Sequence, residues 1–148
     1  MKLKMLLISL LALSSMRNCH SAKPTAETCL NATWKYQAFT RGFYETWELH
    51  NRELTIKKGS NPQAETRKIT LEDGTWNELC ALAQKVEWST LPDLKAPSSK
   101  HRYDGAAGAT LEVSLVPEGP AVQSVTFDHN NAPGPIQPFL QKIESLIP

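Results

Sequence analysis

Apolar and polar residues alternate in two neighbouring stretches of the sequence. From Trp34 to Ala38 every second residue is apolar, and a second face then gathers Phe43, Glu45, Trp47 and Leu49. A period of two is that of a β-strand, whose successive side chains point to opposite faces of a sheet. The abundance of aromatic residues supports the same interpretation. The pattern therefore predicts two strands, joined by a tight turn at residues 41–42.

Shorter alternating runs follow at 54–56, 66–71, 110–115 and 125–127. A turn at 50–52 separates the second strand from the third, and a proline- and glycine-containing turn at 117–120 separates the last two. The run at 66–71 is the most polar, as expected of an edge strand. The sequence thus predicts four strands in the first half of the chain and two in the second.

Two stretches have helical rather than strand periodicity. From Thr75 to Val86 apolar residues recur at helical spacing, and Thr75 with Glu78 matches a capping box at the start of a helix. The second stretch begins at Pro135 and places its apolar residues on one side as far as Ile147. Proline is tolerated in the first turn of a helix. Both stretches are predicted to be amphipathic helices.

The resulting order is four strands, a helix, two strands and a helix. Strands joined by tight turns form an antiparallel sheet, and two amphipathic helices need one face of that sheet to bury their apolar sides. We therefore expect a single α+β domain over residues 33–148, built as a two-layer sandwich with both helices on one face.

The first 18 residues have the layout of a signal peptide. Lys2 and Lys4 precede nine apolar residues, which are too few to span a bilayer as a helix. Residues 19–32 are small and polar and resemble a tether. We therefore expect export, and a membrane association that depends only on a possible lipid anchor.

The cysteines carry two further predictions. Cys19 stands where a bacterial lipoprotein signal places its lipidated cysteine, although ordinary cleavage after Ser21 is the alternative. Either outcome leaves Cys29 and Cys80 as a pair in an oxidising compartment, which predicts a disulfide. Two separate buried thiols are the alternative to that bond.

Charge and motifs exclude several classes of protein. Beyond residue 18 the chain carries 13 Lys and Arg against 15 Asp and Glu, so it lacks the positive surface that nucleic-acid binding requires. Phosphate-binding loops, nucleophile elbows and paired metal ligands are absent from the sequence. No cofactor, metal or catalytic residue is assigned, and a non-catalytic role is favoured.

Polar residues gather at the open end of the predicted hairpin between 110–115 and 125–127. Residues opposite each other in a strand pair share a face, and pairing Val113 with Val125 matches apolar with apolar side chains. That register places Ala109 opposite His129. The candidate polar site consists of His101, Arg102, Asp104, Asp128 and His129.

This candidate site has two interpretations. In the functional one, His129 is a general base or a ligand beside Asp104 and Asp128. In the structural one, Asp128 accepts from amides of the loop 130–134, Asp104 forms a turn, and Arg102 pairs with an acid. The structural interpretation is favoured, because polar residues beside a hairpin usually serve its turns.

Aromatic residues are concentrated in the first two predicted strands. Most of them fit core and cross-strand packing. Phe39 and Tyr44 fall off the main alternation and are expected at the surface, where they could contact a partner or a glycan.

The sequence around Asp104-Gly105-Ala106 and Phe127-Asp128-His129, with two prolines before a closing apolar helix, resembles small uncharacterised exported or lipoprotein domains of Bacteroidota-type bacteria. The turn at 42–44 fits the same resemblance. The resemblance implies an exported protein with a β-rich α+β fold, and it implies no particular activity.

Three functions remain open. The first is an envelope domain that binds an unknown protein or glycan. The second is a secreted inhibitor that presents the loop 95–103 to an enzyme cleft. The third is a small hydrolase that uses His129 with Asp104 or Asp128, which requires those side chains to converge in a concave pocket.

Overall fold

The computed structural model describes residues 26–148. Its helices are α1 (Ala26–Asn31), α2 (Asp73–Ala83) and α3 (Gln137–Glu144). Its strands are β1 (Thr33–Thr40), β2 (Phe43–His50), β3 (Glu53–Gly59), β4 (Thr66–Thr70), β5 (Gly108–Ser114), β6 (Ala121–Gln123) and β7 (Phe127–Asp128). Two short 3₁₀ helices, η1 (Trp88–Asp93) and η2 (Lys100–Tyr103), lie between α2 and β5.

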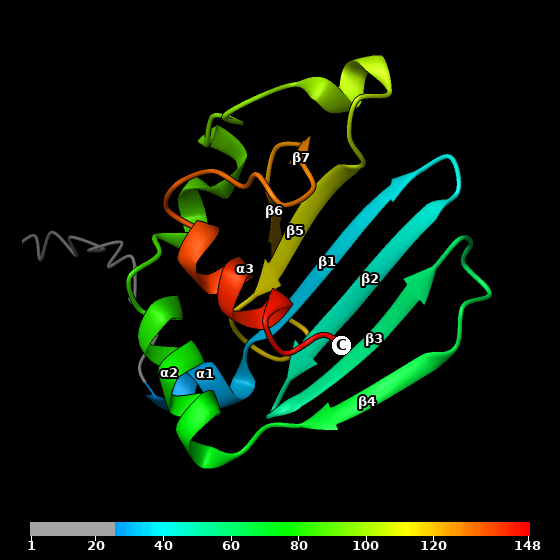
Figure 1. Cartoon of the computed structure of the whole chain (residues 1–148). Helices are drawn as coiled ribbons and strands as arrows, with labels where there is room; N and C mark the ends of the chain where they lie inside the picture. Colours follow the sequence, from blue (N-terminus) through cyan, green and yellow to red (C-terminus); the bar gives the residue numbers. More distant parts are fainter. Residues whose placement is uncertain (1–25) are drawn as a thin grey trace, which may run out of the picture.

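All strands belong to one antiparallel sheet, in the order β4-β3-β2-β1-β5-β6, with β7 pairing the other end of β5 beside β6 (Figure 1). The predicted α+β class and its antiparallel sheet are confirmed. The first four strands pair consecutively because their tight turns return each strand beside the one before it.

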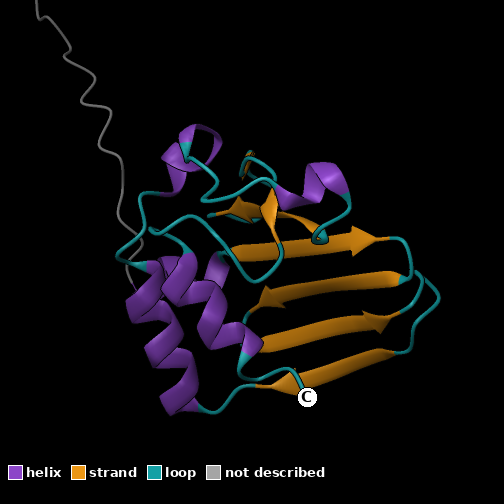
Figure 2. Ribbon diagram, turned by 45° about the horizontal axis from the view of Figure 1, so that its top comes forward, coloured by secondary structure: helices purple, strands orange, loops and turns teal. Residues whose placement is uncertain are grey.

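The alternation seen in the sequence sorts the side chains between the two faces of the sheet. Trp34 and Leu49 are fully buried on the inner face, whereas Lys35 and Glu48 are exposed on the outer face. Figure 1 shows α3 lying across the sheet, and Figure 2 shows the helices gathered towards one end of the strands. The ring of Phe139 on α3 lies 5.3 Å from that of Trp34, so this helix contributes directly to the core.

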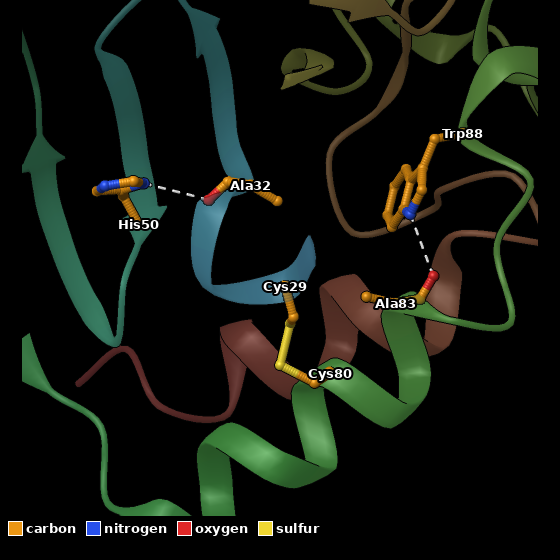
Figure 3. The surroundings of a disulfide bond; sticks show 6 residues. All are labelled: Cys29, Ala32, His50, Cys80, Ala83 and Trp88. Carbon is orange, nitrogen blue, oxygen red and sulfur yellow. Dashed lines mark hydrogen bonds between the residues drawn. A yellow bond between two sulfur atoms is a disulfide. The ribbon is translucent and has the colours of Figure 1, made fainter. Parts of the chain in front are cut away.

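The predicted disulfide is confirmed. Cys29 on α1 and Cys80 on α2 are bonded, with Cα atoms 5.9 Å apart, inside the usual range (Figure 3). The bond closes a loop of 51 residues, which stabilises the fold by about 4 kcal/mol in the chain-entropy model. Residues 26–32, expected to belong to a tether, are therefore part of the folded unit, and Cys29 is 1% exposed.

The two long helices differ from the prediction at their ends. Helix α2 begins at Asp73, before Thr75, and its N-cap residue Glu72 forms no side-chain capping bond. The capping box is therefore not used, and the chain continues as a helix up to Ala83. Helix α3 begins at Gln137, two residues after the predicted start at Pro135, and the proline in its first turn is Pro138.

The return strand after β5 does not have the predicted register. Val113 lies opposite Val122 rather than Val125, and Ala109 lies opposite Phe127 rather than His129. The predicted pairing is off by two residues at β7 and by three at β6. The two-residue shift keeps the side chains of β7 on the predicted face, whereas the odd shift at β6 reverses the face and places Val122, instead of Val125, beside Val113.

A bulge around Ser124 separates β6 from β7. The amide of Ser124 donates to the carbonyl of Leu111 at 2.8 Å, and its hydroxyl accepts from the amide of Leu111 at 3.0 Å. The return strand has one residue more than β5 between the flanking pairs, as in a β-bulge. The serine side chain replaces the missing backbone partner.

The signal peptide at 1–18, the lipidation site Cys19 and the cleavage alternative at Ser21 lie outside the described residues. Within residues 26–148, no helix has both the length and the apolar character that crossing a membrane requires. The disulfide itself indicates folding in an oxidising compartment.

Candidate functional site

The five residues of the predicted polar site separate into two groups on opposite faces of the sheet. Asp128 and His129 are neighbours in sequence, so their side chains point in opposite directions from the strand. Asp128 contacts the segment around η2, whereas His129 contacts Tyr36 on the inner face. The structure therefore does not place His129 in a common site with Asp128.

Asp128 anchors the chain before β5. It is 2% exposed and accepts hydrogen bonds from the amides of Lys100 at 2.9 Å and His101 at 2.7 Å. The ring Nδ1 of His101, at 2.6 Å, and the hydroxyl of Ser98 bond the same carboxylate. From the loop 130–134, the amide of Asn131 donates to the backbone carbonyl of Asp128 at 2.8 Å, whereas the carboxylate accepts from the segment 98–101.

Hydrogen bonding dominates the ionisation of Asp128. Burial by itself would raise the pKa of this carboxyl group, because charge is disfavoured away from water. The hydroxyl of Ser98, the amide and ring of His101 and the amide of Lys100 outweigh burial and hold the pKa well below its usual range. Asp128 is therefore a charged structural residue at neutral pH.

The remaining residues of the predicted site lie at the tip of the segment 98–104, which Asp128 holds in place and which we call the anchored segment. Tyr103 is 82% exposed, and Arg102 and Asp104 are exposed on either side of it. Asp104 has a left-handed φ of 56°, and the amide of Gly105 bonds the carbonyl of Lys100. Asp104 thus forms a turn, while among residues 26–148 Arg102 forms no ion pair with an acid.

A second polar group, which we call the inner cluster, lies on the buried face. It consists of Tyr36, Glu45, Lys58, His129 and Glu144. The hydroxyl of Tyr36 is 2.8 Å from Nδ1 of His129. One ligand atom from each of Glu45, His129 and Glu144 lies within 4.8 Å of the other two. Three strands, the segment after β7 and the end of α3 thus converge on one small region.

Glu45 is the most deeply buried member of the inner cluster. Its side chain is 0% exposed, and neither of its oxygens accepts a regular hydrogen bond from any of residues 26–148. The ammonium of Lys58 lies 2.9 Å from its Oε2, but the Lys58 side chain is 43% exposed. The indole N–H of the adjacent Trp47 is also buried without a regular partner in this part of the chain.

Burial changes the ionisation of the other members. The pKa of Glu144 is raised to about 7 by burial and by the charge of Glu45, with opposing effects from Lys58 and Trp47. The pKa of His129 is lowered by burial, although Glu45 partly offsets it. Burial, together with the two carboxylates, also raises the pKa of Tyr36, so its hydroxyl remains neutral.

A cavity of about 200 Å³ adjoins the inner cluster. Tyr36 and Glu144 belong to both. The rest of the wall comes from β7, the segment after it and α3: Phe127, Asn130, Ala132, Gln137, Leu140 and Gln141. The cluster is therefore open to a small molecule on one side.

Sequence reasoning identified His129 but missed Glu45 and Glu144. The missing signal was a charged residue in an apolar pattern. Glu45 alternates with Phe43 and Trp47 on the predicted inner face, and Glu144 is one turn after Leu140 in the apolar stripe of the last helix.

The outer face of the sheet is the second candidate surface. It forms a hollow of about 490 Å³ over β5, β1, β2 and β3. Cross-strand pairing arranges its side chains in rows, one of which is Thr110, Gln37, Thr46 and Lys57. Alongside this row Phe39, which is 58% exposed, lies opposite Tyr44. Most of this surface offers hydroxyl, amide and charged groups.

The anchored segment borders this face. Gly108 lies opposite Phe39, and a Cβ placed on Gly108 would be 3.6 Å from the Cβ of His101. The η2 segment, with Arg102 and Tyr103 at its tip, therefore stands beside the aromatic pair on the outer side of the sheet.

Comparison with known proteins gives no further guide to function. The chain matches no protein-family model, and a search of curated proteins finds no similar sequence.

Proposed function

We propose that this chain is an exported, non-catalytic binding domain of the cell envelope whose outer sheet face binds a glycan. In this proposal the domain is a two-layer sandwich. Helices α2 and α3 occupy the inner face, and the outer face is free for a ligand. The disulfide supports an exported compartment, and lipidation of Cys19 would anchor the domain to a membrane.

The observation that carries the proposal is the chemistry of the outer hollow. Its volume of about 490 Å³ falls within the range of ligand pockets. The row through Gln37, Thr46 and Thr110 supplies paired donors and acceptors, which match the hydroxyl groups of a saccharide. Phe39 and Tyr44 add aromatic surface on which the apolar face of a sugar ring can pack.

The inhibitor hypothesis has one specific observation in its favour. The segment 98–104 is held by the buried carboxylate of Asp128 and presents Arg102 and Tyr103 to solvent. Tyrosine and arginine are the residues that dominate many protein interfaces, and a rigid loop loses little entropy on binding. This segment is therefore an alternative binding surface to the outer sheet face, with a protein as its ligand.

Binding of soluble chitooligosaccharides, maltooligosaccharides and muropeptides, followed by amide NMR shifts, tests the proposal. Shifts are expected at Gln37, Thr46 and Thr110. Phe39→Ala should weaken binding by about two- to tenfold, as for the loss of one aromatic contact beside the hollow. Val116→Ala is the matched control, because Val116 is a 51% exposed apolar residue in the turn after β5.

Two outcomes would contradict glycan binding. One is the absence of shifts in that row with every saccharide, and the other is equal affinity of the two variants. If instead Tyr103→Ala releases a protein captured from the envelope while Phe39→Ala does not, the anchored segment is the binding surface.

A further inference from the structure

We propose that Glu45, His129 and Glu144 bind a divalent transition-metal cation of the Zn²⁺ class in the inner cluster. This site lies on the face opposite the proposed glycan surface and does not depend on it. The inference rests on ligand geometry, on the buried carboxylate of Glu45, on the partner of His129 and on the adjoining cavity.

The three side chains form a ligand set that suits this cation. One imidazole nitrogen and two carboxylates are donors that Zn²⁺ accepts, and catalytic zinc sites use three protein ligands. Their ligand atoms lie within 4.8 Å of one another. A cation at about 2.0–2.1 Å from each would bring them to roughly 3.4 Å apart. Binding of the cation would therefore draw the three side chains closer together.

Glu45 supplies the independent sign that something is bound here. A buried carboxylate normally accepts several hydrogen bonds, because an unpaired buried charge is costly. Glu45 is fully buried, and its oxygens lack hydrogen bonds of regular geometry within residues 26–148. Its charged neighbours are the Lys58 ammonium and the carboxyl group of Glu144. A divalent cation bound to Glu45 and Glu144 would balance the charge of both carboxylates.

Tyr36 can orient the imidazole as a metal ligand requires. Its hydroxyl lies 2.8 Å from Nδ1 of His129, so a cation bound at Nε2 would leave this hydrogen bond in place. Histidine ligands usually donate their second ring N–H to an acceptor that fixes the tautomer and the ring orientation. Tyr36 is thus a positioning residue rather than a ligand.

The adjoining cavity gives the cation a place for an exogenous ligand. Tyr36 and Glu144 line both the cluster and the cavity of about 200 Å³. With three protein ligands, the fourth position of a tetrahedral site remains open to a water or a small anion. The remaining wall combines apolar side chains with three amides, those of Asn130, Gln137 and Gln141, which could bind an exogenous ligand.

Lys58 is a competitor for the same carboxylate. Its ammonium occupies the position beside Oε2 of Glu45, and a cation must displace it. Because the side chain is 43% exposed, it can turn towards solvent. Removing this ammonium should therefore raise the affinity for the metal, whereas a purely structural ion pair would lose stability and gain no metal binding.

Calorimetric titration of the EDTA-treated mature chain with Zn²⁺ tests the proposal. Binding of one ion is expected, with Mg²⁺ and Ca²⁺ failing to compete, because one of the three ligands is an imidazole. Glu144→Gln and His129→Gln should each weaken binding at least about tenfold, and Tyr36→Phe about tenfold, as for an outer-shell partner. Lys58→Met should strengthen binding.

Matched controls lie on the outer face of the same strands. Lys57→Met and Glu48→Gln make the same chemical changes away from the cluster and should leave the affinity unchanged. Substitution of Co²⁺ for Zn²⁺ provides an absorption spectrum that reports one imidazole ligand. Circular dichroism of each variant verifies that it is folded.

The proposal is overturned if folded wild-type protein binds no Zn²⁺. It is also overturned if Glu144→Gln and His129→Gln bind the ion as wild type does, since the ion would then sit elsewhere. A Lys58→Met variant with unchanged or lower affinity likewise contradicts it.

Discussion

Two buried carboxylates in this domain have opposite surroundings. Asp128 is 2% exposed and receives hydrogen bonds from two amides, a hydroxyl and an imidazole. Glu45 is fully buried and has one ion pair, to the partly exposed Lys58, beside a second carboxyl group, that of Glu144. Burial of a charge is favourable to a fold only when hydrogen bonds replace its lost water. The hydrogen bonds of Asp128 therefore give it a structural role, whereas a contribution to stability does not explain the burial of Glu45.

The same difference distinguishes the two neighbouring residues of the return strand. Asp128 is part of a satisfied network that fixes the segment around η2. His129, on the other side of the strand, joins a cluster whose charges are incompletely paired. Natural proteins accept such incomplete pairing mainly at functional sites, where it lowers stability in exchange for binding.

The largest expected effect is that of Asp128→Asn. The amide can accept fewer of the four hydrogen bonds, and its own N–H₂ group faces donors. We expect a loss of about 3 kcal/mol or more in the free energy of unfolding, measured by urea titration.

Asp104→Asn is the control for this change. Asp104 is exposed and has a left-handed φ of 56°, which asparagine tolerates well. Its effect should stay within about 0.5 kcal/mol. If the two variants are equally stable, the Asp128 network is not the anchor described here.

Glu45→Met should have the opposite sign. It removes a buried charge, fills the same space with an apolar side chain, and leaves Lys58 able to reach solvent. Replacement of buried ion pairs by apolar residues is often neutral or stabilising. We expect a gain of about 1 kcal/mol in the free energy of unfolding, measured by urea titration with EDTA present.

Glu48→Met, on the exposed outer face, is the control and should change stability by less than about 0.5 kcal/mol. A large loss for Glu45→Met would show that Glu45 is structural.

The sequence predicted the parts of this fold that depend on local periodicity. Alternation located β1 and β2, and the amphipathic stripe located α3, because burial on one face directly imposes these patterns. The disulfide followed from an even pair of cysteines in an exported chain. Each of these predictions needs only residues that are close in sequence or, for the disulfide, the number of cysteines.

The parts that failed depend on choices that the pattern does not encode. No single register describes the return strand, because the bulge at Ser124 offsets the pairing of β6 from that of β7 by one residue. The inner cluster joins Glu45 and Glu144, which are separated by nearly the whole domain. In the sequence, each of these residues appears only as a charge within an apolar pattern. Such a charge indicates a site only when the residues that lie beside it in the folded protein are known.

The final prediction concerns pH and has a smaller effect. Glu144 faces Tyr36 from β1, Glu45 from β2, Lys58 from β3 and His129 from the segment after β7. His129 titrates in an overlapping range with the opposite sign, since its pKa is lowered. The pH dependence of the free energy of unfolding of the wild type is therefore the sum of both contributions. The difference in this free energy between wild type and Glu144→Gln isolates the contribution of Glu144.

The sign for Glu144 follows from its raised pKa of about 7. Between the unfolded value near 4.5 and the folded value, the folded state binds more protons, so stability falls as the pH rises through this window. Asp128 has a lowered pKa, and its stabilisation is lost only as the pH falls below about 4. Urea titrations in EDTA between about pH 3 and pH 8 should show the advantage of Glu144→Gln over wild type growing from about pH 5 to pH 7 and then levelling. A difference that is constant across that window would mean that Glu144 is not held in its neutral form by Glu45.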